Sequence, residues 1–410
     1  MIDENALQVA IQKAETELLG NILPFWIAHT VDRTRGGFYG EITNDLVVDE
    51  TAPRGALLSS RILWTYAAAY RRYPNPAYLE MANWAYTWLM RHFWDEQYGG
   101  LYWVGDAEGK PLNPRKQIYG QAFGIYALAE YFGVTQNREA LDRAIRIYAA
   151  IEEHSYDPVY KGYFEACTRD WQPEMDMRLS AVDLNEKKSM NTHLHILEAY
   201  TNLLRAWRDP GLEAKLAELI DVMSDHVIDG RHARTVLFFD ERWTPRSDRI
   251  SYGHDIETSW LMTEAAEVLG DPKRLPQIKA LAIRMAQAVY DHALDPDGAI
   301  VYEADPNGLI HDYKEWWPQA EAAVGFLNAY QLSGQAHFLD AALGAWDFIE
   351  THLVDRSHGE WFRYVTRDGK AGTDQAKVSF WKCPYHNGRA CMELVDRLRQ
   401  LLAGPAADCP

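Results

Sequence analysis

Two histidines stand near the starts of separate helical segments, each in a setting that suits acid–base chemistry. In SYGHDIETSWL, His254 and Glu257 are three residues apart and share one helical face, so Glu257 could orient the imidazole and tune its pKa. In FWKCPYHNGRACME, His386 follows a proline and falls in a first helical turn. There the positive end of the helix dipole favours the neutral imidazole, which can accept a proton near neutral pH.

A third candidate lies in KSMNTHLHILEAY. His193 and His195 are two residues apart and point to different sides of a helix, so they cannot readily hold one metal ion. His195 falls on the face that we expect to look inward. A hydrogen-bonded core histidine is the alternative interpretation.

Other chemistries have weaker support. His254 and Glu257 could also be metal ligands or a structural pair, but no second carboxylate–histidine pair accompanies them, so we expect no metal. Cys383 and Cys391 lie in no recognisable cysteine–histidine arrangement for a nucleophile. The chain has no GxGxxG or P-loop motif, and we therefore expect no cofactor.

Aromatic residues suggest a sugar ligand. KEWWPQAEA places Trp316, Trp317 and Glu321 where a helix begins, with Pro318 in a position suited to the first turn. Adjacent indoles can stack on sugar rings, although either indole could instead fill space in the protein core. Histidines around a sugar-sized funnel suit proton transfer at a carbon next to a carbonyl. Inverting that carbon requires one group on each face, and donors that hold the enediolate oxygen.

The elements that would position these residues form a repeat. An Asp opens a turn that leads into a short aromatic, strand-like segment, and this pattern recurs every 60 to 72 residues. The fourth copy is the weakest, because no glycine precedes its aromatics. The six turns begin at Asp32, Asp95, Asp157, Asp229, Asp295 and Asp355.

Two helical patterns follow most turns, for example residues 54–73 and 77–94, giving about twelve helices in all. An open solenoid needs polar caps at both ends, whereas here the last helical segment resembles an inner helix and residues 5–29 could supply its outer partner. We therefore predict one domain, residues 1–410: an all-α (α/α)6 barrel with short β-hairpin or turn segments between repeats. The candidate residues, at the starts of alternate helices, should converge on one rim.

The composition limits the kinds of molecule that the protein could bind. The formal net charge is -18 and no basic stripe is visible, which argues against nucleic acid and anionic membranes. Four cysteines make no disulfide framework, and the chain shows neither a signal-like segment nor an apolar run long enough for a bilayer. We expect a cytoplasmic monomer that binds a small sugar, either a disaccharide or a monosaccharide.

Five strings together resemble the N-acylglucosamine 2-epimerase superfamily, and within it the cellobiose 2-epimerase branch. They are APRGALLSSRILWTYAAAY, KSMNTHLHILEAYTNL, SYGHDIETSWL, EWWPQAEA and FWKCPYHNGRA, and they span residues 52–391. The resemblance implies an (α/α)6 barrel and an enzyme that needs no cofactor. It also implies a mechanism: the sugar ring opens, C2 is deprotonated to a cis-enediolate, the C2–C3 bond rotates, and a proton returns to the other face.

The same resemblance implies roles for individual residues. His254 and His386 would be the acid–base pair, and His195 would assist ring opening. Arg61 would stabilise the enediolate oxygen, and Glu257 would orient the histidines. The sugar sites would be lined by Tyr119, Asn191, Trp260, Trp317, Glu321 and Trp381, with Trp317 and Trp381 as stacking platforms.

Alternatives remain. Mannose 2-epimerases and mannose isomerases carry much the same acid–base set, although WKCPYHNGRA favours the disaccharide branch. Proton return to C1 would make the enzyme an aldose–ketose isomerase. An inverting glycoside hydrolase would need two carboxylates about 6.5–9.5 Å apart, and the turn aspartates are not such a pair. If the barrel only bound sugar without catalysis, the histidines would have no catalytic role.

Overall fold

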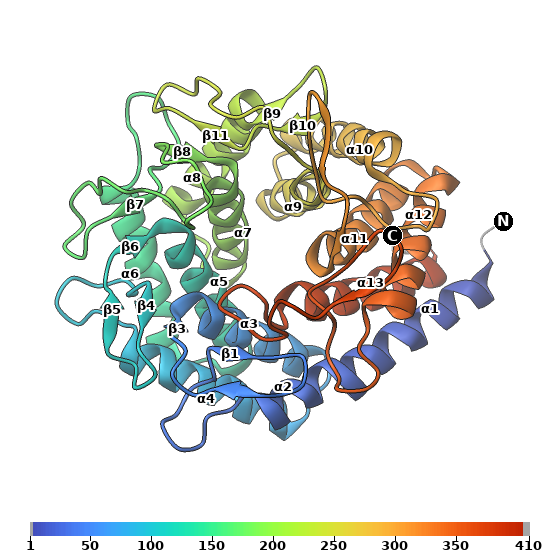
Figure 1. Ribbon diagram of the computed structural model, residues 1–410. Helices are drawn as coiled ribbons and strands as arrows, with labels where there is room; N and C mark the ends of the chain where they lie inside the picture. The colour runs from blue at the N-terminus through green and yellow to red at the C-terminus, as the bar shows by residue number, and fades with distance from the viewer. Residues whose placement is uncertain (1–2, 405–410) are drawn as a thin grey trace, which may run out of the picture.

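The computed structural model describes residues 3–404, which form a ring of six inner helices surrounded by outer helices (Figure 1). The inner helices are α3 (Ala56–Arg72), α5 (Ile118–Thr135), α7 (Met190–Ala206), α9 (Tyr252–Leu269), α11 (Trp316–Ser333) and α13 (Tyr385–Ala403). Each packs on the next, and α13 returns to α3. The predicted (α/α)6 barrel is confirmed.

The outer helices surround the inner ring. They are α4 (Pro76–His92), α6 (Arg138–His154), α8 (Pro210–Val222), α10 (Arg274–Ala293), α12 (Ala336–Phe348), and α1 (Glu4–Glu17) with α2 (Leu23–His29). Two of them, α8 and α10, each contact two neighbouring inner helices. Short π-helical turns join α1 to α2 at Leu18–Ile22 and extend α8 at Met223–Val227 and α12 at Ile349–Leu353. Helix α1 packs on α13, so the first and last helices close the ring as the sequence predicted.

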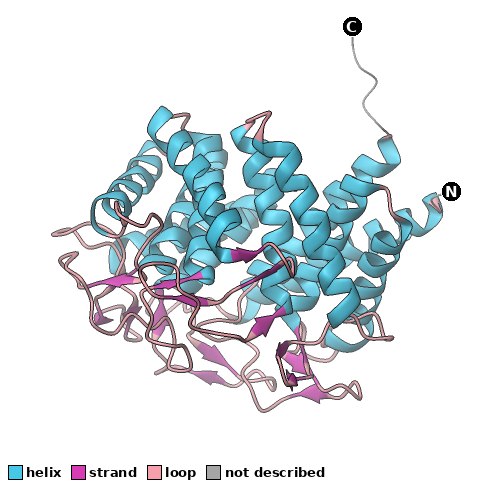
Figure 2. Cartoon of the chain, turned by 90° about the horizontal axis from the view of Figure 1, so that it is seen from above, coloured by secondary structure: helices cyan, strands magenta, loops and turns pink. Residues whose placement is uncertain are grey.

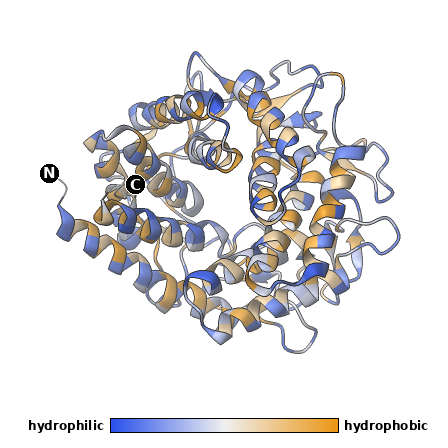
Figure 3. Cartoon of the chain, turned by 180° about the vertical axis from the view of Figure 1, so that it is seen from behind, coloured by the Kyte–Doolittle hydropathy of each residue, from blue (hydrophilic) through white to orange (hydrophobic). Residues whose placement is uncertain are grey.

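Hydrophobic patterning separates the two layers. Helix α5 is buried along most of its length, as expected for a helix that is apolar on all sides. Helix α6 instead buries one stripe, formed by Ala140, Leu141, Ala144, Ile147 and Ile151. Figure 3 shows this mixture, with hydrophilic and hydrophobic residues alternating along the outer helices. No helix of the described residues is long and apolar enough to cross a membrane.

The strands lie together at one end of the barrel (Figure 2). They are β1 (Glu41–Ile42), β2 (Val48–Asp49), β3 (Arg54–Gly55), β4 (Val104–Gly105), β5 (Pro111–Asn113), β6 (Lys116–Gln117), β7 (Ala166–Cys167), β8 (Lys188–Ser189), β9 (Ile228–Asp229), β10 (Arg234–Thr235), β11 (Phe238–Phe239), β12 (Ile250–Ser251), β13 (Glu303–Asp305), β14 (Gly308–His311), β15 (Lys314–Glu315), β16 (Tyr364–Val365) and β17 (Ala371–Gly372).

Antiparallel pairing links neighbouring repeats. Strands β3, β6, β8, β12 and β15 each run directly into an inner helix. Each pairs with a strand of the following repeat, giving the pairs β3–β4, β6–β7, β8–β11, β12–β13 and β15–β16. This pairing holds the amino ends of the inner helices at the same rim, which is where the candidate residues lie.

The turn aspartates bind buried cations that precede the inner helices. Asp95 accepts a hydrogen bond from Lys116 Nζ at 3.0 Å, and Asp157 accepts one from Lys188 Nζ at 2.8 Å. The equivalent pairs in other repeats are Asp32–Arg54, Asp295–Lys314 and Asp355–Lys377. These pairs tie each turn to the strand that leads to the inner wall.

The fourth repeat differs, as its missing glycine suggested. The position two residues before α9 holds Ile250 instead of a cation, and Asp229 pairs with His232 at a surface where its side chain is 33% exposed. Ala233 takes a φ of 52° in this turn, in the left-handed region that usually favours glycine.

Candidate active site

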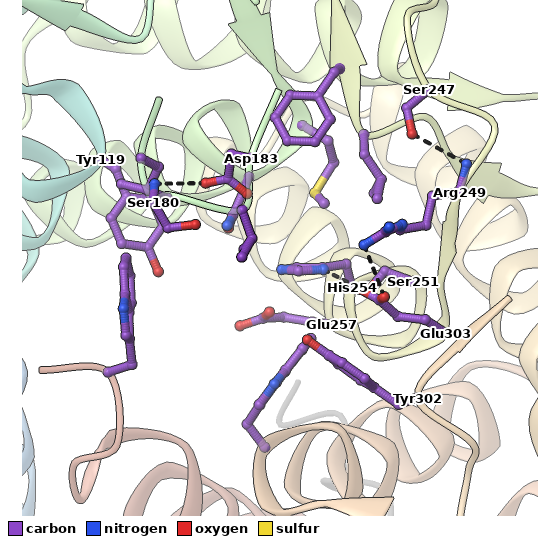
Figure 4. A pocket seen from close by; sticks show the side chains of 18 of the residues that line it. Tyr119, Ser180, Asp183, Ser247, Arg249, Ser251, His254, Glu257, Tyr302 and Glu303 are labelled. Atoms are coloured by element: carbon purple, nitrogen blue, oxygen red, sulfur yellow. Dashed lines mark hydrogen bonds and ion pairs between the residues drawn. The ribbon is translucent and has the colours of Figure 1, made fainter. Parts of the chain in front are cut away.

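A cavity of about 670 Å³ lies where the inner helices begin. Its walls include residues of the first two turns of α3, α5, α7, α9, α11 and α13 and the segments 179–184 and 246–249. In Figure 4, Tyr119 and Asp183 stand on one side of the cavity, facing His254 and Glu257 on the other. The volume and the mixed polar and aromatic wall suit a ligand of sugar size.

Nine of the eleven predicted site residues line this cavity: Arg61, Tyr119, Asn191, His195, His254, Glu257, Trp317, Trp381 and His386. The other two, Trp260 and Glu321, were expected to line the sugar sites but lie behind the wall. The indole N–H of Trp260 donates to Glu321 Oε2 at 2.9 Å, and both side chains are buried. Of the two, Glu321 contacts the wall through His386.

Each cavity histidine has its own hydrogen-bond partner. His386 Nδ1 lies 2.7 Å from Glu321 Oε1, and His195 Nδ1 lies 2.9 Å from Glu198 Oε2. The third histidine, His254, bonds through Nδ1 to Ser251 Oγ at 2.7 Å (Figure 4). These bonds fix the rings, and Nε2 of each ring makes no hydrogen bond with the described residues, so it is free to exchange protons with a ligand.

Glu257 does not orient His254, contrary to the sequence-based expectation. Its Oε1 accepts a hydrogen bond from Arg389 Nη2 at 2.7 Å. The same guanidinium also binds Glu321 at 2.7 Å and contacts Glu198. Arg389 therefore links the carboxylates behind two of the three histidines.

The neighbouring histidine, His193, is a core residue. Its Nε2 accepts the backbone N–H of Tyr163 at 2.8 Å, and its Nδ1 lies 2.6 Å from the carbonyl oxygen of Ser189. Both ring nitrogens are thus satisfied inside the protein. The two histidines of this segment therefore have different surroundings, as their different directions on the helix implied.

Burial sets the protonation of the site. It lowers the pKa of His254 and of His386 to about 3, so both rings are neutral at neutral pH. Burial also raises the pKa of Glu257 above its usual range, and the nearby Glu321 raises it further. Although burial opposes ionisation of Glu321 as well, Arg389 and His386 hold the pKa of this carboxyl below its usual value.

Arg61 is a buried cation that faces the cavity. Its Nη2 donates to the Tyr119 hydroxyl at 2.6 Å, and its guanidinium carbon lies 4.3 Å from the ring centre of Phe123 and 4.9 Å from that of Tyr385. Among the described residues no carboxylate lies within 4 Å of it. A cation without a paired anion in a buried site is suited to bind an oxyanion that develops on a ligand.

The two predicted platforms stand on different walls. The ring centre of Trp317 lies 4.7 Å from that of His254 and 5.6 Å from that of His386. Gly253 allows this packing, because a Cβ there would come within 2.5 Å of the Trp317 ring. Trp381 lies on the other side, 6.2 Å from the ring centre of Tyr119.

Ligand atoms of Glu257, Glu321 and His386 lie within 4.8 Å of one another, a spacing that a metal ion could use. However, Arg389 already donates to both carboxylates, and His386 bonds to Glu321. The guanidinium therefore balances the charge of this cluster. The absence of a metal from the reaction stays a prediction.

Comparison with known proteins identifies the family. The family model for N-acylglucosamine 2-epimerase (GlcNAc 2-epimerase) matches residues 37–388. The chain belongs to the N-acylglucosamine 2-epimerase family. It is therefore a carbohydrate epimerase, an enzyme of the isomerase class.

Members of this family with similar sequences match nearly the whole chain. A cellobiose 2-epimerase of Bacteroides fragilis is 45% identical over 95% of this chain and 99% of its own, and one of Dictyoglomus turgidum is 38% identical over 96% and 100%. The structure of cellobiose 2-epimerase from Bacillus thermoamylovorans aligns with a TM-score of 0.91 and 41% identity, over 95% of this chain and all of that one. A D-mannose isomerase structure, with a TM-score of 0.80 and 20% identity, shares the fold.

Some residues of this epimerase site were missed from the sequence. Glu198 follows His195 by three residues, the same spacing as His254 and Glu257, so a search for that spacing would have found it. Ser251 immediately precedes α9 and gave no signal. The cavity segments 179–184 and 246–249 lie in irregular loops, whose path local patterns do not determine.

Proposed function

We propose that this epimerase inverts C2 of the reducing-end glucose of cellobiose and related β-1,4-linked disaccharides, giving glucosyl-mannose. The similarity to several cellobiose 2-epimerases supports this substrate class. So does the cavity, whose volume of about 670 Å³ exceeds what one hexose ring needs.

Two neutral imidazoles from different inner helices carry the proposal. His254 from α9 and His386 from α13 both pack near Trp317, and each has an uncommitted Nε2. One imidazole takes the C2 proton of the open-chain sugar, and the C2–C3 bond of the enediolate rotates. The other imidazole takes up a proton from solvent and passes it to the opposite face of C2.

The remaining groups complete the reaction. A carboxylate holds His195 in place, so its free Nε2 can move a proton between the ring oxygen and O1 as the sugar opens. Arg61 stabilises the negative charge on the enediolate oxygen, because it is buried and has no carboxylate of its own. The proton balance closes because the first imidazole releases its proton to solvent or uses it in the reverse reaction, while the second draws its proton from solvent.

Product analysis tests this function. Cellobiose, and separately mannose, would be incubated with the enzyme and the products separated by chromatography. Glucosyl-mannose as the main product from cellobiose is the expected result. A ketose as the main product would make the enzyme an isomerase, and turnover of mannose alone would make it a monosaccharide enzyme; either would contradict the proposal.

A further inference from the structure

One wall of the cavity carries a buried carboxylate that the mechanism above does not use. Glu315 is the last residue of β15 and immediately precedes α11. It lines the cavity, although only 6% of its surface is exposed. An ionisable side chain that is buried at a cavity wall needs polar partners.

The hydrogen bonds of Glu315 leave one oxygen unused. Oε2 accepts the indole N–H of Trp317 at 3.0 Å. Oε1 accepts no hydrogen bond from the described residues, and the side chain makes no capping bond to α11 despite standing at its N-cap position. Capping of α11 therefore does not explain why a carboxylate stands at this position.

A guanidinium with unused donors lies in the same wall. Arg363 donates from Nη1 to Ser379 Oγ at 3.3 Å, while its Nε is buried without a partner and its Nη2 makes no hydrogen bond among the described residues. Its guanidinium carbon lies 5.3 Å from the ring centre of Trp316. Arg363 and Glu315 do not form an ion pair within 4 Å in the described chain, so an acceptor and a donor remain available side by side.

We infer that Glu315 and Arg363 form a hydroxyl-binding pair that holds the sugar against Trp317 and thereby sets affinity for substrate. Glu315 accepts one sugar hydroxyl through Oε1, Arg363 donates to another, and the Trp317 indole, which is bonded to Glu315, supplies an apolar surface. This inference rests on the proposed function for the identity of the sugar, but not on its reaction. Hydrogen bonds to a charged group in a buried site are stronger than neutral ones.

The surroundings of Glu315 make this binding depend on pH. Burial raises the pKa of Glu315 to about 7; Glu303 raises it, while Arg363 and the Trp317 N–H lower it. The hydroxyls of Tyr302 and Tyr313 face the same carboxyl and stay protonated, since burial raises their pKa values. Acidification through pH 7 removes the charge from Glu315, so sugar binding should weaken.

The test uses cellobiitol, which binds as a disaccharide but has no carbonyl and cannot be epimerised. Calorimetric titration would give its Kd for the wild type and for Glu315→Gln. The amide oxygen of Gln can still accept the Trp317 N–H, so a purely structural role predicts no change. We expect Kd to rise at least about tenfold at pH 8, and the KM for cellobiose to rise similarly with kcat within twofold.

Two further measurements test whether Glu315 is the group that makes sugar binding depend on pH. Wild-type Kd should rise as pH falls from 8 to 6, and this rise should be smaller in Glu315→Gln, where only other cavity carboxyls such as Glu257 still titrate. The wild-type titration does not depend on how well the variant folds. Glu165→Gln is the matched control, because burial raises the pKa of Glu165 to about 7 as well but this residue lies outside the main cavity. Its Kd should keep the wild-type pH dependence.

The outcomes separate this inference from the proposed function. Equal Kd values for wild type and Glu315→Gln, a pH-independent wild-type Kd, or no binding of cellobiitol would overturn the role of Glu315. A wild type that binds cellobiitol with the expected pH dependence but leaves C2 of cellobiose unchanged would instead contradict the proposed reaction alone.

Discussion

The two proposed acid–base histidines differ in what holds the ring. A carboxylate, Glu321, stands behind His386, whereas a hydroxyl, Ser251, stands behind His254. A carboxylate stabilises an imidazolium more than a hydroxyl does. Both rings are neutral at rest, and we expect His386 to become protonated during turnover more readily than His254.

Removing either histidine should abolish proton transfer on one face. His254→Ala and His386→Ala should each lower kcat by about 10²–10⁴-fold, the usual contribution of a general acid or base, with an unchanged circular dichroism spectrum. Initial rates with cellobiose measure this. His193→Gln is the control, because His193 bonds only to the backbone: it should lower stability but not the kcat of the folded enzyme. A rate within threefold of wild type for either cavity variant would refute the two-base assignment.

The pH dependence of kcat should reflect the buried histidines. Burial lowers the pKa of His254 and of His386 to about 3, so the base stays unprotonated well below the usual histidine value of about 6.5. Measured at saturating cellobiose, kcat should not fall between pH 7.5 and about 5.5, because the base stays neutral throughout this range. Half-loss of kcat near pH 6.5 would show that the working base is a solvent-exposed histidine.

The charge balance around Arg389 predicts independence from metal ions. Its guanidinium binds Glu257 and Glu321, the two carboxylates of the candidate metal cluster. Dialysis against a chelator should leave the initial rate with cellobiose unchanged. A loss of activity that added divalent ions restore would show that the cluster holds a metal.

At the scale of single residues, spacing in the sequence predicted part of the site but not every hydrogen-bond partner. The three-residue spacing placed Glu257 on the same helix face as His254, but a residue 132 positions away, Arg389, takes its carboxylate. Likewise, Glu315 and Arg363 come together only because β15 pairs with β16 of the next repeat. Such partners depend on tertiary packing, which local patterns do not contain.

At the scale of elements, the turns act as fixed anchors for the inner helices. Lys188 donates to Asp157 and to the carbonyl oxygens of Lys161 and Glu241, so its buried ammonium group is fully bonded. The sequence repeat predicted the turns but not these cations, because their distance from the turn aspartate varies from 19 residues for Asp295 and Lys314 to 31 for Asp157 and Lys188. The missing glycine of the fourth copy was the visible sign of an anchor that differs.

Removing one of these buried ion pairs should lower the free energy of unfolding. Lys188→Met leaves the buried Asp157 carboxylate and two carbonyls unpaired, and should lower the free energy of unfolding by about 3–5 kcal/mol. Asp229→Asn, in the repeat whose aspartate is exposed and pairs with a histidine, should cost less than about 1 kcal/mol. Urea titrations followed by circular dichroism compare them. Equal losses would mean that the buried cations do not anchor the turns.

At the scale of the whole molecule, periodicity predicted the barrel and its closure. Helix α1 reaches α13 across the full sequence, where Glu15 binds Arg399 at 2.7 Å. This closure was predictable because the last helix lacked a sequential outer partner. The cavity segments 179–184 and 246–249 were not, since they have no regular structure and differ between repeats.

The ring brings six helix starts to one rim, and this convergence allows two imidazoles to act on opposite faces of one carbon. Proton NMR of cellobiose incubated with the enzyme in D2O, without added metal, tests this claim most directly. The account predicts that deuterium appears at C2 as glucosyl-mannose accumulates, because the returned proton comes from a solvent-exchanged imidazole. Epimerisation without deuterium at C2, or no exchange at all, would contradict it.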